Sequence, residues 1–229
     1  MPFSSVIADR SNARIYSFGD AVLAGWADDG GMLWPTQVPK LNRGILTSWA
    51  KLSYSQLCAE LLKLFVPDND VDISHADIEA LVSSAFDAFG SDKVVETKPL
   101  PSSRSSPIHV AELWHGPTLA FKDLGMSVLG KTLNHLLTRR TRRLTLLVGT
   151  SGDTGSSAIE AVRGLRNIDI VVLYPLQAFS ASACTRFPCS MPAQHPEKLP
   201  PTSCRLLRAT NLLPIASISR QSPRCRRGR

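Results

Sequence analysis

One lysine of this sequence lies where an amine could act as a nucleophile. Lys122 lies beside the apolar residues Phe121 and Leu119, at the predicted start of a helix. Apolar surroundings favour the neutral amine, which is the form that condenses with a carbonyl group to give a Schiff base. A lysine taken at random more often lies on a helix surface with its ammonium group in water. His115, in the preceding turn, is by the same measure more often a turn residue than an acid or a base.

A second segment, residues 150–155, has the composition of an anion-binding loop. It reads Thr-Ser-Gly-Asp-Thr-Gly, follows a predicted buried strand and opens a predicted helix. Glycines let the backbone approach a ligand closely, and unpaired N–H groups at a helix start attract phosphate or carboxylate. An ordinary turn in which Asp153 or Thr154 only caps the helix fits the residues about equally well. The loop lacks the spacing and the lysine of the nucleotide-binding G-x-x-x-x-G-K-[ST] pattern.

The elements around these two segments alternate between strands and helices. Apolar strands separated by a helix indicate a parallel βαβ unit in an α/β sheet. The 150–155 segment would then lie at the carboxyl end of the strands, where ligands bind. The expected elements are strands over 108–113, 144–148 and 168–174, a helix over 124–137 capped by Asp123, and a helix over 156–165.

The N-terminal part of the chain predicts helices joined by turns. Apolar residues follow helical spacing from Ser55 to Phe65. A further helix would begin after Ser74, which can cap it, and end at Gly90. Residues 99–107 are rich in Ser and Pro and indicate a loop.

The composition changes after Pro175. Residues 176–229 hold nine Lys or Arg against one acidic residue, whereas residues 1–175 hold 17 against 18. Seven prolines interrupt this tail, so we expect it to be disordered, because it can bury too little surface to offset the entropy of ordering it. The balanced charge of the body gives no electrostatic case for nucleic-acid binding. Arginines between Arg220 and Arg229 leave such a site open only for the tail, where solvation is the commoner role.

Metal, membrane and secretory signals are weak in this sequence. The tail cysteines and His195 match no zinc-site spacing, so we expect no metal. No apolar run is long enough to span a membrane, and the first fourteen residues lack the apolar core of a secretory signal. A cytoplasmic protein is therefore expected.

The two chemical motifs together resemble one family. H-G-P-T-x-A-F-K-D over residues 115–123, followed by T-S-G-D-T-G-S over 150–156, is similar to the pattern of threonine synthases and threonine synthase-like phospho-lyases. The opening segment 17–35, with its D-G-G turn, and Leu-Ser-Tyr at 52–54 resemble the same family. The resemblance covers about residues 15–175.

This resemblance implies a fold and a cofactor. The fold would be α/β, of the fold-type II shared with tryptophan synthase β chains, and incomplete. It implies an N-terminal threonine synthase domain over 1–100, the start of a pyridoxal-phosphate-binding α/β domain over 101–175, and an unrelated tail over 176–229. Lys122 would form the Schiff base with pyridoxal 5'-phosphate and later move protons, and Asp153 would face the cofactor's ring. The substrate's carboxylate would be held by Thr150, Ser151, Gly152, Thr154 and Gly155.

The resemblance leaves more than one activity open. A threonine synthase converts O-phosphohomoserine to threonine and phosphate, whereas a phospho-lyase would release a keto acid from O-phosphothreonine or O-phosphohomoserine. The motifs present do not separate these outcomes. The family's glycine-rich loop for the cofactor's phosphate is not recognisable after Pro175. We therefore expect a truncated form with little activity, or a non-enzymatic product that acts through its tail.

Overall fold

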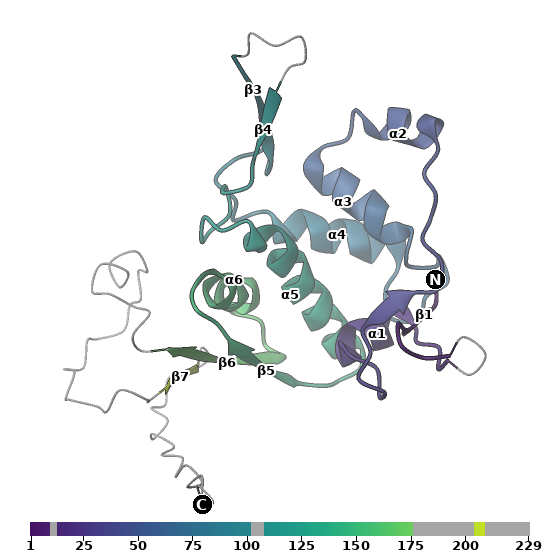
Figure 1. The fold of residues 1–229 in the computed structure, drawn as a ribbon, viewed down its shortest axis with the longest axis vertical. Coiled ribbons are helices and arrows are strands. Elements are labelled where there is room, and N and C mark those ends of the chain that lie inside the picture. The colour runs from purple at the N-terminus through teal and green to yellow at the C-terminus, as the bar shows by residue number, and fades with distance from the viewer. Residues whose placement is uncertain (10–12, 102–107, 176–203, 209–229) are drawn as a thin grey trace, which may run out of the picture.

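The computed structural model describes residues 1–9, 13–101, 108–175 and 204–208. These residues form a mainly helical N-terminal part, a projecting β-hairpin and a strand–helix–strand unit (Figure 1). The helices are α1 (Phe18–Ala24), α2 (Arg43–Trp49), α3 (Tyr54–Lys63), α4 (His75–Ala85), α5 (Lys122–Arg139) and α6 (Asp153–Val162). The strands are β1 (Phe3–Ser5), β2 (Leu33–Pro35), β3 (Glu96–Leu100), β4 (Ile108–Glu112), β5 (Leu144–Gly149), β6 (Ile168–Pro175) and β7 (Cys204–Arg208).

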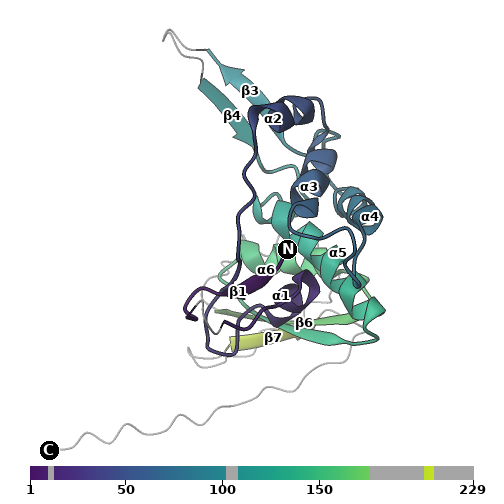
Figure 2. The same ribbon diagram turned by 90° about the vertical axis from the view of Figure 1, so that its right-hand side faces the viewer.

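The predicted βαβ unit is present. Strands β5 and β6 run parallel, paired from Leu144 with Ile168 to Gly149 with Leu173, and α6 crosses between them. Buried side chains of α5, α6 and β6 form one apolar core. Both helices lie on the same face of the sheet (Figure 2). This arrangement places residues 150–152 directly after the carboxyl end of β5 and before the start of α6.

Helices α5 and α6 approach each other closely at a glycine. A Cβ atom added at Gly130 of α5 would lie 2.3 Å from the carbonyl oxygen of Ala161 in α6. Only a residue without a side chain fits there, because backbone atoms on the facing helix cannot move aside as a flexible side chain could. The close contact packs the middle of α5 against the C-terminal end of α6, and each of the two chemical motifs immediately precedes one of these helices.

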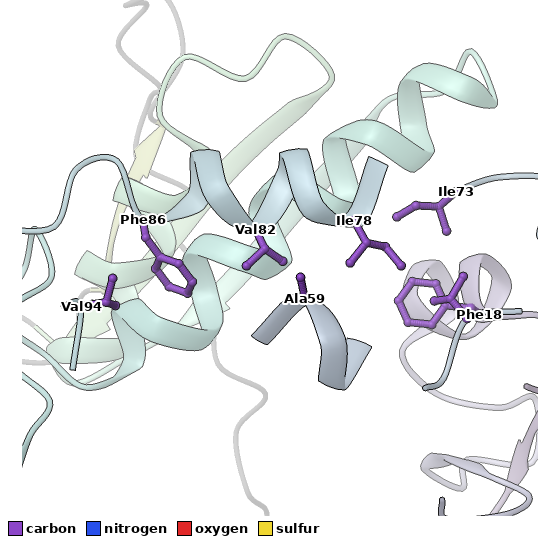
Figure 3. Packing of buried hydrophobic residues seen from close by; sticks show 8 residues of the cluster. Phe18, Ala59, Ile73, Ile78, Val82, Phe86 and Val94 are labelled. Carbon is purple, nitrogen blue, oxygen red and sulfur yellow. The ribbon is translucent and has the colours of Figure 1, made fainter. Parts of the chain in front are cut away.

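The N-terminal helices share a second core, which runs along α4 (Figure 3). Ile78, Val82 and Phe86 lie in a row, with Ala59 of α3 against one side and Phe18 of α1 at one end. The predicted cap at Ser74 is confirmed, because Ser74 forms a capping box with Asp77. Ser53, which was not predicted as a cap, forms a second capping box with Gln56. These caps start α3 and α4 with their apolar stripes facing this core.

Four element boundaries differ from the prediction. Helix α4 ends at Ala85 rather than Gly90, because Phe86 leaves helical geometry and packs edge-on against both Tyr54 and Phe89. Strand β4 pairs with β3 in an antiparallel hairpin and not with the α/β sheet, so part of the expected 99–107 loop is strand. Helix α6 begins at Asp153, three residues earlier than expected.

The fourth difference lies in the tail. Residues Cys204–Arg208 form β7, an edge strand antiparallel to β6. The expectation of an unfolded tail did not include this strand, which lies in the proline-free stretch between Pro201 and Pro214. Backbone hydrogen bonds can hold a short edge strand without an alternating apolar pattern. The rest of that expectation, over 176–203 and 209–229, falls outside the described residues.

An arginine joins the N-terminal part to α5. Arg140 lies in an arginine-rich stretch at the end of α5, yet its side chain is only 24% exposed. Its guanidinium donates to Asp20 of α1 at 2.7 Å and to both carboxylate oxygens of Asp72. These hydrogen bonds, to Asp72 first, raise the pKa of Arg140 further above its ordinary value. One ionic contact therefore ties α1 and the segment before α4 to the C-terminal end of α5.

Candidate functional site

Lys122 is the first residue of α5 and is half-buried. Its Nζ atom lies over the ring of Phe121, 4.9 Å from the centroid. Phe121 is itself 60% exposed, so the amine lies near apolar surface and remains open to a ligand. Among the described residues, no hydrogen bond or ion pair engages this amine. A primary amine with no internal partner is available for chemistry.

A tight loop precedes Lys122, and residues 115–123 are called the lysine loop. Residues 116–121 fold back so that the Leu119 N–H donates to the Gly116 carbonyl at 3.1 Å. Leu119 adopts a φ of 63°, a left-handed conformation that costs a non-glycine residue about 1 kcal/mol or more. Such a conformation persists only where surrounding contacts enforce it. The contacts that enforce it here come from Asp123.

Asp123 was expected to cap α5. Instead, it binds the loop that precedes the helix. The N-cap of α5 is Phe121, which makes no side-chain cap hydrogen bond. One carboxylate oxygen of Asp123 accepts from the Thr118 N–H at 2.8 Å, and the other accepts from the Thr118 hydroxyl at 2.6 Å. The side chain turns back towards the loop and not along the helix, because Thr118 presents two donors side by side.

A hydroxyl contact links the lysine loop to α6. The Thr118 Oγ1 atom lies 3.1 Å from Ser157 Oγ. Ser157 is buried, four residues into α6, and therefore follows the 150–155 segment closely. Thr118 of the first motif is thus joined, across 39 residues, to the helix that follows the second motif.

The 150–155 segment is organised by Thr150. The hydroxyl oxygen of Thr150 accepts from the N–H groups of Gly152 and Gly155, each at 3.0 Å. A Cβ atom at Gly155 would lie 2.3 Å from Thr150 Cγ2, so the second glycine lets the threonine fit. Thr150 and Gly155 thus shape the loop, and their contact with substrate stays a prediction. A Cβ atom at Gly152 would meet no atom within 4 Å, so this part of the loop faces open space.

The loop leaves backbone donors open. The N-cap of α6 is Gly152, which makes no side-chain cap hydrogen bond, so the alternative in which Asp153 or Thr154 serves as the cap is wrong. Among the described residues, no hydrogen bond satisfies the N–H groups of Asp153 and Thr154. Donors left unpaired at a helix start attract an anion. The geometry supports anion binding at this loop.

Lys98, Glu112 and His115 form a chain of polar contacts beside the lysine loop, which was not predicted from the sequence. Glu112, 10% exposed at its side chain, accepts from Lys98 of β3 at 2.8 Å and lies 3.0 Å from the His115 ring. The hydrogen bond from Lys98 lowers the pKa of Glu112. The carbonyl of His115 accepts from the Gly90 N–H at 2.7 Å. His115 is therefore a turn residue held from both sides. The i,i+3 spacing of Glu112 and His115 was the feature of the sequence that could have indicated this contact.

These residues fit a carbonyl compound that also carries an anionic group. The Lys122 amine can attack a carbonyl carbon, and the open donors of the 150–155 loop can hold the anion. No group of three His, Cys, Asp or Glu residues suited to a metal ion occurs in the described ranges. None of the helices described is long and apolar enough to cross a membrane.

The fold and the site define an α/β protein in which Lys122 and the 150–155 loop lie at the starts of two adjacent helices. The family model for the threonine synthase N terminus matches residues 6–86. Threonine synthase-like 2 of Xenopus laevis is 43% identical over 69% of this chain, and the human protein of that name 40% over 74%. Threonine synthase of Pseudomonas aeruginosa is 37% identical over 74%. The chain belongs to the threonine synthase family.

Solved structures agree with this assignment. A threonine synthase from Brucella melitensis with bound PLP aligns over 81% of this chain, at a TM-score of 0.71 and 34% identity. The yeast enzyme aligns over 81% at a TM-score of 0.74 and 29% identity. The fold is therefore that of these enzymes in incomplete form. The chain spans about a third of the length of the curated relatives it matches, 32% and 34% for the frog and human proteins, and 38% and 37% of the two solved chains.

Proposed function

We propose that this chain is part of a pyridoxal-phosphate-dependent lyase that acts on a phosphorylated amino acid, with Lys122 as the cofactor lysine. The observation that supports this most strongly is the partnerless Lys122 amine, joined through Thr118 and Ser157 to a loop with open backbone donors. Relatives named threonine synthase favour O-phosphohomoserine as substrate, with threonine and phosphate as products. The N-terminal domain would span 1–100 and the start of the cofactor domain 101–175. We expect the protein in the cytoplasm.

Each residue at the site has a task in this proposal. Pyridoxal phosphate, when bound, supplies an electron sink that allows the substrate's phosphate to leave. Lys122 would hold the cofactor and, once released, move protons at the Cα and Cβ atoms of the substrate. The N–H groups of Asp153 and Thr154, with the hydroxyls of Ser151 and Thr154, would hold the substrate's carboxylate. The Asp153 side chain would face the cofactor's ring.

The same residues would serve a phospho-lyase. Both chemistries need a lysine base and a carboxylate clamp, and they differ in whether water adds at Cβ before the product leaves. The identity of the carbon product released from O-phosphohomoserine therefore decides between them: threonine for a synthase, a keto acid for a phospho-lyase.

The test uses the 229-residue chain with added pyridoxal phosphate. We expect a yellow Schiff base that is absent from Lys122→Ala, and little release of phosphate from O-phosphohomoserine or O-phosphothreonine. Little turnover is expected because the described residues supply no second loop to anchor the cofactor's phosphate, and loosely held reactants lose most of the rate gain of alignment. A chain that forms no Schiff base would contradict the proposal. Turnover equal to that of a full-length relative would contradict the expected loss of activity.

A further inference from the structure

A buried carboxylate underlies the lysine loop. Asp123 is only 1% exposed, and among the described residues no Lys, Arg or His lies within ion-pair distance of it. Burying an unpaired carboxylate is costly unless hydrogen bonds replace the lost water. Within the described residues, both hydrogen bonds to this carboxylate come from Thr118. Since α5 needs no aspartate for its cap, the fold keeps this costly group for another purpose.

The loop is wrapped around that carboxylate. A Cβ atom added at Gly116 would lie between 2.4 and 2.8 Å from three atoms of the Asp123 side chain. The backbone at Gly116 therefore packs directly on the carboxylate, while Thr118 binds it two residues later. The Asp123 N–H donates to the Ala120 carbonyl at 3.0 Å, which closes the loop at its other end. The path of residues 116–121 is thus set by one side chain.

The same carboxylate orients the link to α6. Asp123 can only accept, so the Thr118 hydroxyl must give its proton to it. The Thr118 oxygen is then free to accept, and Ser157 must be the donor across the 3.1 Å contact. The hydrogen bonds run in one direction, from Ser157 through Thr118 to Asp123. This chain holds the start of α5, where Lys122 lies, against the helix that follows the 150–155 loop.

We propose that Asp123 is a positioning residue for Lys122, which fixes the amine relative to the 150–155 loop through Thr118 and Ser157. This rests on the proposed function in so far as Lys122 is the cofactor lysine. The Lys122 amine has no hydrogen-bond partner among the described residues that would place it, so its location depends on the backbone of residues 121–123. Catalytic groups need placement to about half an ångström, which buried neighbours of this kind provide.

The variants separate position from charge and from stability. Asp123→Ala removes both acceptors, and Thr118→Val removes one donor and the link to Ser157. Asp123→Asn keeps the shape: its oxygen can accept from the Thr118 N–H, and its amide can donate to the Thr118 hydroxyl, which then donates to Ser157. Thr138→Val is the control, because it removes a threonine hydroxyl with two hydrogen bonds at the far end of the same helix.

The first measurement is the labelling of Lys122 relative to Lys131 by pyridoxal phosphate and borohydride, with thermal unfolding followed in parallel. Losing a hydrogen bond to a charged group changes populations by about tenfold or more. We expect the Lys122 to Lys131 ratio to fall at least about tenfold in Asp123→Ala and Thr118→Val, and to recover in Asp123→Asn. Thr138→Val should leave it unchanged. An unaltered ratio in Thr118→Val, or a fall in Asp123→Asn as deep as in Asp123→Ala, would overturn the proposal.

A second measurement works without the cofactor. If the unmodified chain takes no label at Lys122, the proposed function fails, and the positioning proposal is decided by acetylation of Lys122 with acetic anhydride. Thr118→Val and Asp123→Ala should then change the Lys122 to Lys131 acetylation ratio by about tenfold, with Asp123→Asn near the unmodified chain. Amide hydrogen exchange of residues 116–121 should speed up in the same two variants. Equal ratios and equal exchange in all variants would refute the positioning role.

Discussion

The lysine loop, residues 115–123, and the 150–155 loop contain similar residues but differ in how they use their backbone N–H donors. In both, a threonine before a helix makes two hydrogen bonds that fix the backbone, and a glycine leaves room for them. In the lysine loop Thr118 donates to a carboxylate, so its own N–H is used up. In the other loop Thr150 accepts, and the N–H groups of Asp153 and Thr154 stay open. A loop that binds a side chain uses its backbone N–H donors within the fold, whereas a loop suited to an anion leaves such donors unpaired.

The largest expected effect comes from removing the amine. Lys122→Ala should abolish the visible absorbance of the Schiff base completely, since no other described lysine begins a helix beside an anion-binding loop. Lys131→Ala, on the same helix, is the matched control and should leave the absorbance unchanged. A Schiff-base band retained in Lys122→Ala would show that the lysine loop does not hold the reactive amine.

The next effect tests the 150–155 loop. Thr150→Val keeps the shape of the side chain and removes the oxygen that accepts from Gly152 and Gly155. Losing two hydrogen bonds of about 0.5–1.5 kcal/mol each loosens the loop, so affinity for phosphate or O-phosphothreonine should fall about tenfold. Calorimetric titration measures this. Thr145→Val, on the exposed face of β5, is the control, and equal losses in both variants would remove the special role of Thr150.

A glycine substitution should act on stability more than on chemistry. Gly155→Ala would bring a Cβ atom to 2.3 Å from Thr150 Cγ2 and should lower the free energy of unfolding by about 1–3 kcal/mol. Gly149→Ala, which would meet no atom within 4 Å, should cost little. Urea unfolding of the two variants compares them directly. Similar losses would mean that Thr150 does not pack against Gly155 as described.

The smallest expected effect lies outside both loops. Arg140→Met removes the contact to Asp20 and Asp72 and should cost about 1–2 kcal/mol of the free energy of unfolding at neutral pH, because one carboxylate partner is half exposed. The hydrogen bond from Arg140 lowers the pKa of Asp20 below its ordinary value of 3.8. A lowered carboxyl pKa stabilises the fold above the ordinary value, and that gain is lost as the pH falls through the lowered one.

The variant should therefore differ from the unmodified chain at neutral pH and converge with it in acid, below pH 3.8. Urea unfolding at the two pH values measures the difference. A gap that stays constant with pH would show that Asp20 takes no part in the contact. Schiff-base formation at Lys122 should be unaffected, since Arg140 lies at the other end of α5.

The sequence predicted the elements that depend on local patterns. The cap at Ser74 and the parallel pair β5 and β6 follow from a capping residue and apolar strands, and both are confirmed. The role of Asp123 was misjudged, because an acidic residue in a first helical turn usually serves the helix start. Only the three-dimensional path of the loop shows that Thr118 lies within its reach.

Long-range contacts set what could not be predicted. Arg140 meets Asp20 and Asp72, which lie 120 and 68 residues away, and no spacing rule connects them. Ser157 lies in the helix expected over 156–165, and its contact with Thr118, 39 residues away, could not be predicted from that expectation. Strand β7 pairs with β6 through backbone hydrogen bonds, for which an irregular sequence gives little warning.

Mapping of the lysine that binds pyridoxal phosphate tests directly whether Lys122 is the cofactor lysine. The chain is incubated with pyridoxal phosphate, reduced with borohydride, digested and mapped by mass spectrometry. We expect the peptide that contains Lys122 to carry far more pyridoxyl label than the peptide of any other lysine. A label on Lys131, or labels spread evenly over the surface lysines, would contradict it.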